Sequence, residues 1–99
     1  MQEFGKIEVF CSKKFNLSVV RALLLSGKGV SFNTLLKTLQ PITPRVLSQR
    51  LKELEQLGLV QKNLVLGKKP KIEYLATSKA EGLRKAIKEL EKWGNSTLN

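Results

Sequence analysis

Histidine and aspartate are absent from this 99-residue sequence, and all eight of its acidic residues are glutamates. The chain therefore has no Ser-His-Asp triad, no histidine for acid-base catalysis near neutral pH and no ordinary histidine-cysteine zinc site. We expect a protein that is not an enzyme and that binds neither a metal ion nor another cofactor.

Cysteine and long apolar runs are also scarce. The single cysteine, Cys11, excludes an intramolecular disulfide framework, and we expect it to be a small hydrophobic residue, buried or half-buried. The longest apolar runs, such as residues 22–25, are far too short to cross a bilayer, and the N-terminus does not resemble a signal peptide. These features favour a cytoplasmic protein that does not contact a membrane.

Negative charge is outnumbered, because 18 Lys and Arg residues face eight Glu residues, for a formal net charge of +10. A chain with this charge attracts polyanions, and the attraction weakens as salt is added. Residues 43–71 alone hold seven of the basic residues and two of the glutamates. A lysine-rich surface that serves only solubility is the alternative, but such surfaces usually balance lysine with glutamate. Double-stranded DNA is favoured over RNA as the partner, because few aromatic residues are present to stack on bases.

The first segment of the chain fits two descriptions. Lys6–Phe10 alternates polar and apolar residues, which is the period of a strand, and an irregular N-terminal arm over residues 1–13 fits as well. A helix is predicted from about residue 16 to residue 26, with either Asn16 or Ser12 as its N-cap and a glycine after its last residue.

A short extended piece at 30–32 leads into a second predicted helix, over about 34–39. Asn33 is favoured over Ser31 as the N-cap of this helix. Pro41 ends it, because the residue before a proline avoids helical geometry. Only a short, broken connection then separates it from the next helix, which is the arrangement of a helix-turn-helix.

The clearest predicted helix spans residues 43–57. Thr43 is a good N-cap, Pro44 suits the first helical position, and Gly58 can close the helix in the left-handed conformation. One face is apolar, with Val46, Leu47, Leu51, Leu54 and Leu57. The opposite face carries Arg45, Ser48, Gln49, Lys52 and Gln56. The first two turns lack the acidic residues that a helix N-terminus favours, which indicates a surface for binding an anion.

Two strands are predicted next, within residues 59–76. They lie at about 59–64 and 71–75 and flank a turn with a glycine, a proline and two lysines, Lys68 and Lys69. A basic hairpin directly after a recognition helix is typical of a wing, which reaches phosphates or the minor groove. An ordinary solvated hairpin is the alternative.

A final helix is predicted over residues 77–94, capped by Thr77 or Ser78, with a frayed tail over 95–99. Its apolar stripe is longer than so small a domain needs, so we expect part of it to form a dimer interface. The expected dimerisation residues are Leu83, Ile87, Leu90 and Trp93. The alternative is that the helix simply packs on its own domain.

Residues 42–60 resemble the recognition-helix signature of the HxlR family of transcriptional regulators, which is related to the MarR and PadR groups. Pro70–Tyr74, followed by Thr77, is similar to the return strand of the family's wing, and the resemblance covers about residues 14–94. It implies an α+β fold in which residues 14–76 form a winged helix-turn-helix domain with a two-stranded basic wing, followed by a C-terminal dimerisation helix.

The family usually has an additional N-terminal helix that begins near a cysteine able to sense oxidants or electrophiles. In this sequence the segment before Lys14 is too short for that helix, so we do not expect Cys11 to be the sensing residue. The sequence identifies no small-molecule effector.

The resulting hypothesis is a homodimer that sets the 43–57 helix of each protomer into successive major grooves of a palindromic site. The expected base-reading residues are Arg45, Ser48 and Gln49. The expected phosphate contacts are Thr43, Arg50, Lys52, Lys68, Lys69 and Lys71, although Arg50 alternatively pairs with Glu53 or Glu55. Two other functions fit the composition, a sequence-neutral architectural or chromatin protein and a winged-helix protein-interaction module.

Overall fold

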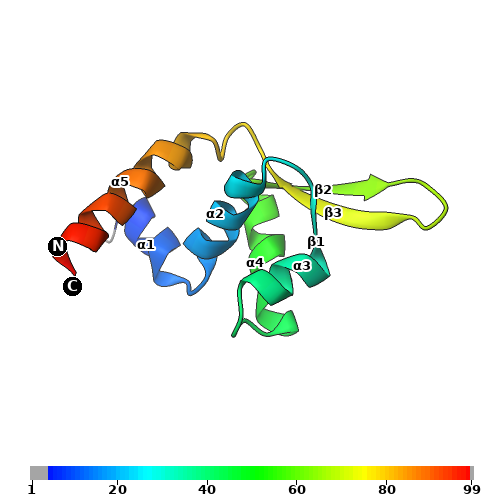
Figure 1. Cartoon of the computed structure of the whole chain (residues 1–99), viewed down its shortest axis with the longest axis horizontal. Helices are drawn as coiled ribbons and strands as arrows, with labels where there is room; N and C mark the ends of the chain where they lie inside the picture. The colour runs from blue at the N-terminus through cyan, green and yellow to red at the C-terminus, as the bar shows by residue number, and fades with distance from the viewer. Residues whose placement is uncertain (1–4, 99) are drawn as a thin grey trace.

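Helices and a small antiparallel sheet make up residues 5–98, the part of the chain that the computed structural model describes (Figure 1). The elements are α1 (Lys6–Ser12), α2 (Asn16–Ser26), β1 (Val30–Ser31), α3 (Phe32–Thr38), α4 (Pro44–Gln56), β2 (Val60–Val65), β3 (Lys71–Ala76) and α5 (Gly82–Thr97). The first four residues of the predicted arm lie outside the described residues, as does Asn99. The expected α+β winged helix-turn-helix fold is confirmed.

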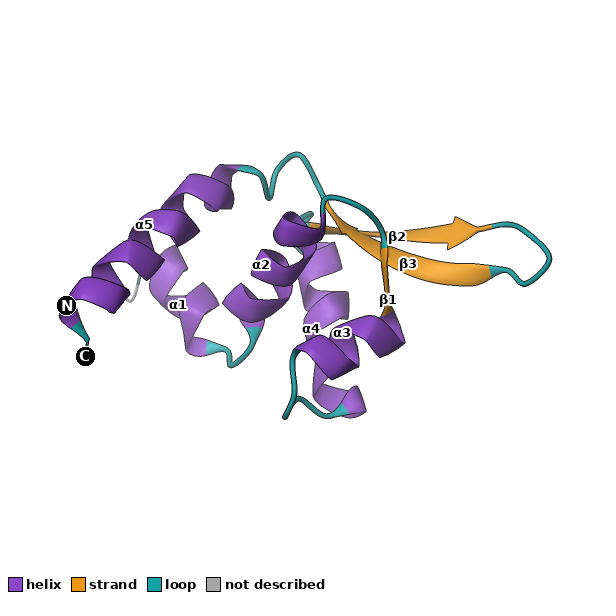
Figure 2. Ribbon diagram, in the orientation of Figure 1, coloured by secondary structure: helices purple, strands orange, loops and turns teal. Residues whose placement is uncertain are grey.

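The sheet has one strand more than the predicted wing. Its order is β1-β3-β2, and β2 and β3 form the expected hairpin. The short extended piece before α3 pairs with the base of β3, with Val30 opposite Tyr74 and Ser31 opposite Glu73. The outer part of the hairpin projects well beyond the helices (Figure 2). The pairing with β1 therefore fixes the base of the wing to the helix-turn-helix.

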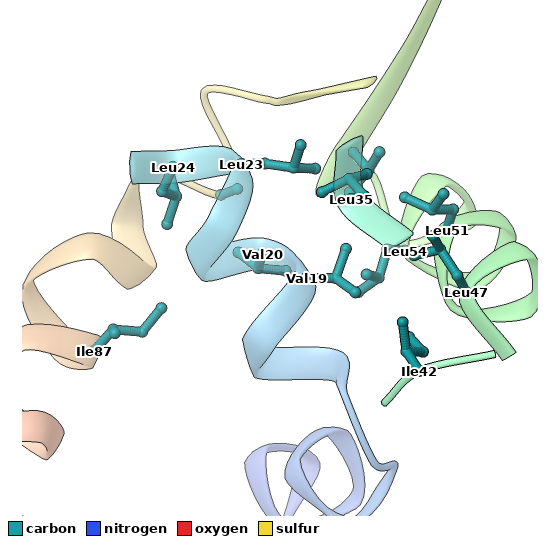
Figure 3. Close-up of a cluster of buried hydrophobic side chains, with 12 residues drawn as sticks. Val19, Val20, Leu23, Leu24, Leu35, Ile42, Leu47, Leu51, Leu54 and Ile87 are labelled. Atoms are coloured by element: carbon teal, nitrogen blue, oxygen red, sulfur yellow. The ribbon is translucent and has the colours of Figure 1, made fainter. Parts of the chain in front are cut away.

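The hydrophobic core lies between α2, α3, α4 and the base of the sheet (Figure 3). Helix α4 contributes Leu47, Leu51 and Leu54, each no more than 2% exposed. Their spacing of four and three residues puts them on one face of the helix, as the sequence predicts. The facing side of α2 contributes Val19, Val20, Leu23 and Leu24. Because α4 buries its leucine face here, its polar face points away from the core.

Residues 6–12 form helix α1, so both the strand and the irregular arm predicted for this segment are wrong. The backbone amide of Gly5 donates a hydrogen bond to the Glu8 carboxylate (2.9 Å), which satisfies an amide at the start of the helix. Phe10 is half-buried against the core and is the inward-facing side chain of the helix. Alternation over five residues was too short a pattern to distinguish a strand from one turn of helix.

The same helix corrects one expectation about the length of its segment and one about the burial of Cys11. The segment before Lys14 is long enough for a helix, and Cys11 lies on it with an exposed side chain rather than a buried one. The half-buried position of this helix is taken by Phe10, and Cys11 is the next residue, on an exposed side.

Two of the predicted N-caps are also wrong. Helix α2 is preceded by Phe15 at φ 76°, and Asn16 is its first residue, buried, with its side-chain amide donating to the Phe10 carbonyl oxygen (2.9 Å). Helix α3 is capped by Ser31, whose hydroxyl accepts from the backbone amide of Thr34 (3.2 Å), rather than by Asn33. Helix α2 therefore starts at the predicted residue but with Phe15 at the N-cap position, whereas α3 starts two residues earlier than predicted, which leaves Asn33 inside α3.

Helix α4 begins and ends as predicted. The Thr43 hydroxyl accepts from the backbone amide of Val46 (3.2 Å), Pro44 is the first helical residue, and Gly58 adopts φ 78° just after the helix. At that φ a side chain would be strained, which is why a glycine suits the position.

Helix α5 starts later and ends later than predicted. The Thr77 hydroxyl donates to the carbonyl oxygen of Gly58 (2.6 Å) and accepts from the amide of Ala80 (3.3 Å), so Thr77 stabilises a turn before α5 instead of capping the helix. The helix then starts at Gly82 and continues through Gly94 to Thr97. The predicted tail is therefore helical over most of its length.

Candidate nucleic-acid interface

The outer face of α4 presents the three expected base-reading residues together. Arg45, Ser48 and Gln49 are all exposed, and their spacing of three and four residues places them on one side of the helix. Lys52 continues the same face one turn further along and is also exposed. The leucines of the buried face fix this orientation, so the four side chains project into solvent from a rigid element.

The start of α4 has the chemistry of an anion site. Thr43 is exposed, and its hydroxyl uses a lone pair to accept the Val46 amide, which leaves its own proton to donate to a phosphate oxygen. The first turn contains no acidic residue, so nothing negative offsets the partial positive charge of the helix end. Arg45 adds a full positive charge at the same end.

Arg50 is not placed with the other basic residues of α4. Its guanidinium donates through Nε to the carbonyl oxygen of Lys14 (3.0 Å) and through Nη1 to the Glu53 carboxylate. Its side chain is only 17% exposed. The alternative pairing with Glu53 is therefore confirmed, and the guanidinium joins α4 to the loop between α1 and α2.

Glu53 is the centre of a small charged cluster next to that loop. Lys13 Nζ lies 2.7 Å from one carboxylate oxygen of Glu53, and Arg50 contacts the other. The hydrogen bond from Lys13, with that from Arg50, lowers the pKa of Glu53 below its usual value. The two cations favour the ionised form of the glutamate. The sequence predicted the contact of Glu53 with Arg50 but not the contact with Lys13, which is 40 residues away in the sequence.

The wing carries the remaining expected phosphate contacts. Lys68 and Lys69 are exposed in the loop between β2 and β3, at the end of the molecule's longest dimension (Figure 1). Lys71 begins β3 and pairs with Glu73 at 3.4 Å, yet its side chain stays 61% exposed. The wing tip is thus cationic and stands apart from the helices, at the end of the hairpin that follows α4.

The C-terminal end of α4 is connected to the segment that leads into α5. Lys79 Nζ donates to the carbonyl oxygen of Leu57 (2.8 Å), where a cation complements the negative end of the helix dipole. The backbone amide of Thr77 donates to the carbonyl oxygen of Leu59 (3.1 Å). No local pattern predicts these contacts, because the partners are about 20 residues apart in the sequence.

The expected dimerisation stripe of α5 divides in two. Leu83 and Ile87 pack on the protein's own core, as the alternative predicted, whereas Leu90 and Trp93 are 54% and 57% exposed. Helix α1 adds Ile7 and Val9, both more than half exposed. A groove of about 720 Å³ runs between α1, the end of α4 and the start of α5, and its lining includes both α1 side chains. The sequence missed this groove because it did not predict α1.

No helix in residues 5–98 is long and apolar enough to cross a membrane. The same residues contain no cluster of cysteine and acidic side chains with the composition of a metal site.

Comparison with known proteins finds helix-turn-helix transcriptional regulators. Residues 10–99 match the model of the HxlR-like helix-turn-helix family. An uncharacterised helix-turn-helix transcriptional regulator of Halalkalibacterium halodurans is 37% identical over 81 residues, covering 82% of this chain and 72% of that protein. The uncharacterised regulator YvaP of Bacillus subtilis is 31% identical over 96 residues, covering 97% of this chain and 87% of that protein.

The fold is also similar to that of a transcriptional regulator whose structure is known. The reduced form of the transcriptional regulator YodB from B. subtilis superimposes with a TM-score of 0.82 at 24% identity, over 97% of this chain and 95% of that one. With its capped helix α4, its basic wing and a family match over residues 10–99, this chain belongs to the HxlR-like helix-turn-helix family of DNA-binding transcriptional regulators, which are not enzymes.

Proposed function

We propose that this regulator binds a specific palindromic DNA site as a homodimer and reads it with the outer face of α4. The observation that carries this proposal is the exposure of Arg45, Ser48 and Gln49 side by side on a helix whose cationic start contains no acidic residue. A helix of 13 residues that is anchored along its other face suits the major groove.

Each of the three side chains has a matching base edge. Arginine donates two hydrogen bonds to O6 and N7 of guanine, and glutamine pairs with N6 and N7 of adenine. The Ser48 side chain is shorter, and its hydroxyl can form a hydrogen bond with more than one kind of base. Arg45 is the residue that we expect to contribute most to the choice of sequence, because its bidentate contact with guanine is the most common specific contact.

The phosphate contacts in this proposal come from both ends of the interface. Thr43 and Lys52 lie on α4, and the exposed wing lysines Lys68, Lys69 and Lys71 lie on the hairpin. We leave Arg50 out of this set, because its guanidinium already donates to Lys14 and Glu53. These contacts supply affinity and register but little choice of sequence.

The proposed dimer interface uses the exposed half of the α5 stripe. Leu90 and Trp93 are more than half exposed in the single chain, and so are Ile7 and Val9 of α1. Large apolar side chains exposed on a folded protein favour an interaction site, and a second copy related by a two-fold axis would cover them. The two α4 helices would then lie about 34 Å apart, one turn of the duplex. We place this activity in the cytoplasm, where bacterial chromosomes lie.

Selection from a pool of random-sequence duplexes by the purified protein, at about 0.15 M salt, tests the proposal. We expect enrichment of a palindrome whose half-sites are about 10 base pairs apart from centre to centre. Enrichment of no sequence, with tight binding to every duplex, would favour the sequence-neutral architectural alternative. Enrichment of a single half-site would contradict the dimer but not the reading role of α4.

A further inference from the structure

The outer half of the wing carries an apolar ridge formed by Leu64, Leu66 and Ile72. In the register of the hairpin, Leu64 lies directly opposite Ile72. Side chains two residues apart on a strand point to the same face, so this pair shares its face with Val60 and Tyr74 nearer the base. Val60 is buried in the core and Tyr74 packs against it. Leu64 and Ile72 therefore continue the inner, core-covering face of the sheet beyond the core itself, and Leu66 follows them in the loop just after β2.

Nothing in the described part of the chain covers the ridge. Leu66 is 77% exposed, Leu64 62% and Ile72 43%, and none of them packs against the core cluster. Large apolar side chains on a projecting hairpin favour association with another molecule. By the register of the hairpin, Leu64 and Ile72 lie on the face of the sheet that covers the core. The hairpin itself extends beyond α3 and α4 (Figure 2).

The charges around the ridge indicate what its partner is. Lys62 lies on the same face as Leu64, and Lys68 and Lys69 lie just beyond Leu66, all three exposed. Glu73 is the single acidic residue of the hairpin, and it pairs with Lys71. The partner must therefore combine negative charge with an apolar surface. The minor groove of DNA does so, because phosphates line its edges and apolar side chains can insert between its base pairs.

We propose that the ridge enters the minor groove beside the site read by α4, with Leu66 wedged against the base pairs and the tip lysines on the flanking phosphates. This inference rests on the DNA-binding role of α4 and adds to it a local bend in the DNA. An apolar wedge in the minor groove partly unstacks a base step and bends the duplex toward the major groove.

The test uses duplexes that the wild-type protein enriches from a random-sequence pool. Affinity is measured by fluorescence anisotropy, and bending by energy transfer between dyes at the two duplex ends. The variants are Leu66→Ser, Leu66→Lys and the control Leu25→Ser, since Leu25 is also 62% exposed but lies on α2, away from the wing.

We expect Leu66→Ser to weaken binding about tenfold, the change that corresponds to loss of one buried leucine side chain, and to reduce the bend. Leu66→Lys also weakens binding, although it adds a positive charge, and Leu25→Ser changes neither affinity nor bend. If Leu66→Lys instead binds more tightly than the wild type, the wing tip contacts phosphates alone and the wedge is wrong.

Two further results separate the possible failures. If the wild-type protein binds and bends its duplex and Leu66→Ser does so equally, the ridge proposal is overturned while the role of α4 stands. If the wild-type protein enriches no duplex, the role of α4 fails and the ridge proposal fails with it. Binding of the wild type to phosphatidylserine vesicles that Leu66→Ser loses, with DNA affinity unchanged, would assign the ridge to a membrane and overturn the proposal.

Discussion

The ammonium group of Lys13 and the carboxylate of Glu53 lie 2.7 Å apart, although 40 residues separate them in the sequence. Lys13 follows directly after α1, and Glu53 lies in the last turns of α4. The contact therefore joins the segment that carries the proposed dimer surface to the recognition helix. Arg50 reinforces the same joint through Glu53 and the carbonyl oxygen of Lys14.

Replacement of Glu53 by Gln should destabilise the fold in a pH-dependent way. Because Lys13 and then Arg50 lower the pKa of Glu53 in the folded chain, the ionised glutamate stabilises the fold above its usual pKa, about 4.3. That contribution is lost as the pH falls through the lowered value. Urea unfolding from neutral pH to below this range should show wild type and Glu53→Gln converging in acid.

Glu55→Gln is the matched control, because Glu55 is exposed on the same helix and makes no ion pair within residues 5–98. A difference between wild type and Glu53→Gln that stays constant down to the lowest pH would show that the ion pair is not its source.

Arg45→Ala should weaken binding to a preferred duplex by about 1–3 kcal/mol and relax the choice of base at one position of each half-site, since a bidentate contact is lost. The measurement is a set of binding titrations on the enriched duplex and on duplexes with single substitutions. An equal loss on every duplex would make Arg45 a phosphate contact instead.

Removal of the two tip lysines should act differently from removal of Arg45. Lys68→Ala with Lys69→Ala should lower affinity by a similar factor on all duplexes, and should reduce the slope of log affinity against log salt by about 2. Lys85→Ala with Lys88→Ala, exposed on α5, removes the same charge far from the wing and is the control. An unchanged salt slope in the wing variant would show that its lysines do not contact phosphates.

Trp93→Ala should dissociate the dimer without unfolding the chain, because this side chain is 57% exposed and does not belong to the core. A central aromatic residue of an interface typically contributes about 2 kcal/mol or more to association. Sedimentation equilibrium of wild type, Trp93→Ala and the exposed-leucine control Leu25→Ala measures the effect. A Trp93→Ala protein that associates as strongly as the wild type would place the interface elsewhere.

The features of α4 that the sequence predicted are all local. Thr43, Pro44 and Gly58 are capping residues whose effect depends on their immediate neighbours, and the spacing of the leucines determines which face is buried. The outer-face residues follow from that orientation. This is why the expected base-reading positions proved to lie together on an exposed face.

The features that the sequence missed depend on distant partners. Thr77 resembles an N-cap in sequence, yet its hydroxyl bonds to Gly58, 19 residues earlier. The guanidinium of Arg50 donates to the carbonyl oxygen of Lys14, 36 residues earlier, and not to a partner on the outer face of α4. Helix α1 is held by the side chain of Asn16, which donates to its Phe10 carbonyl oxygen. The spacing of polar and apolar residues along the chain does not predict hydrogen bonds between residues that are distant in the sequence.

Methylation interference on the enriched duplex tests most directly whether a dimer reads DNA with α4. Guanine N7 faces the major groove and accepts one of the two hydrogen bonds expected from Arg45. We predict that methylation of one guanine in each half-site, about one helical turn apart, blocks the wild-type protein and leaves the binding of Arg45→Ala unaffected. Interference that is absent, or identical for the two proteins, would contradict the account.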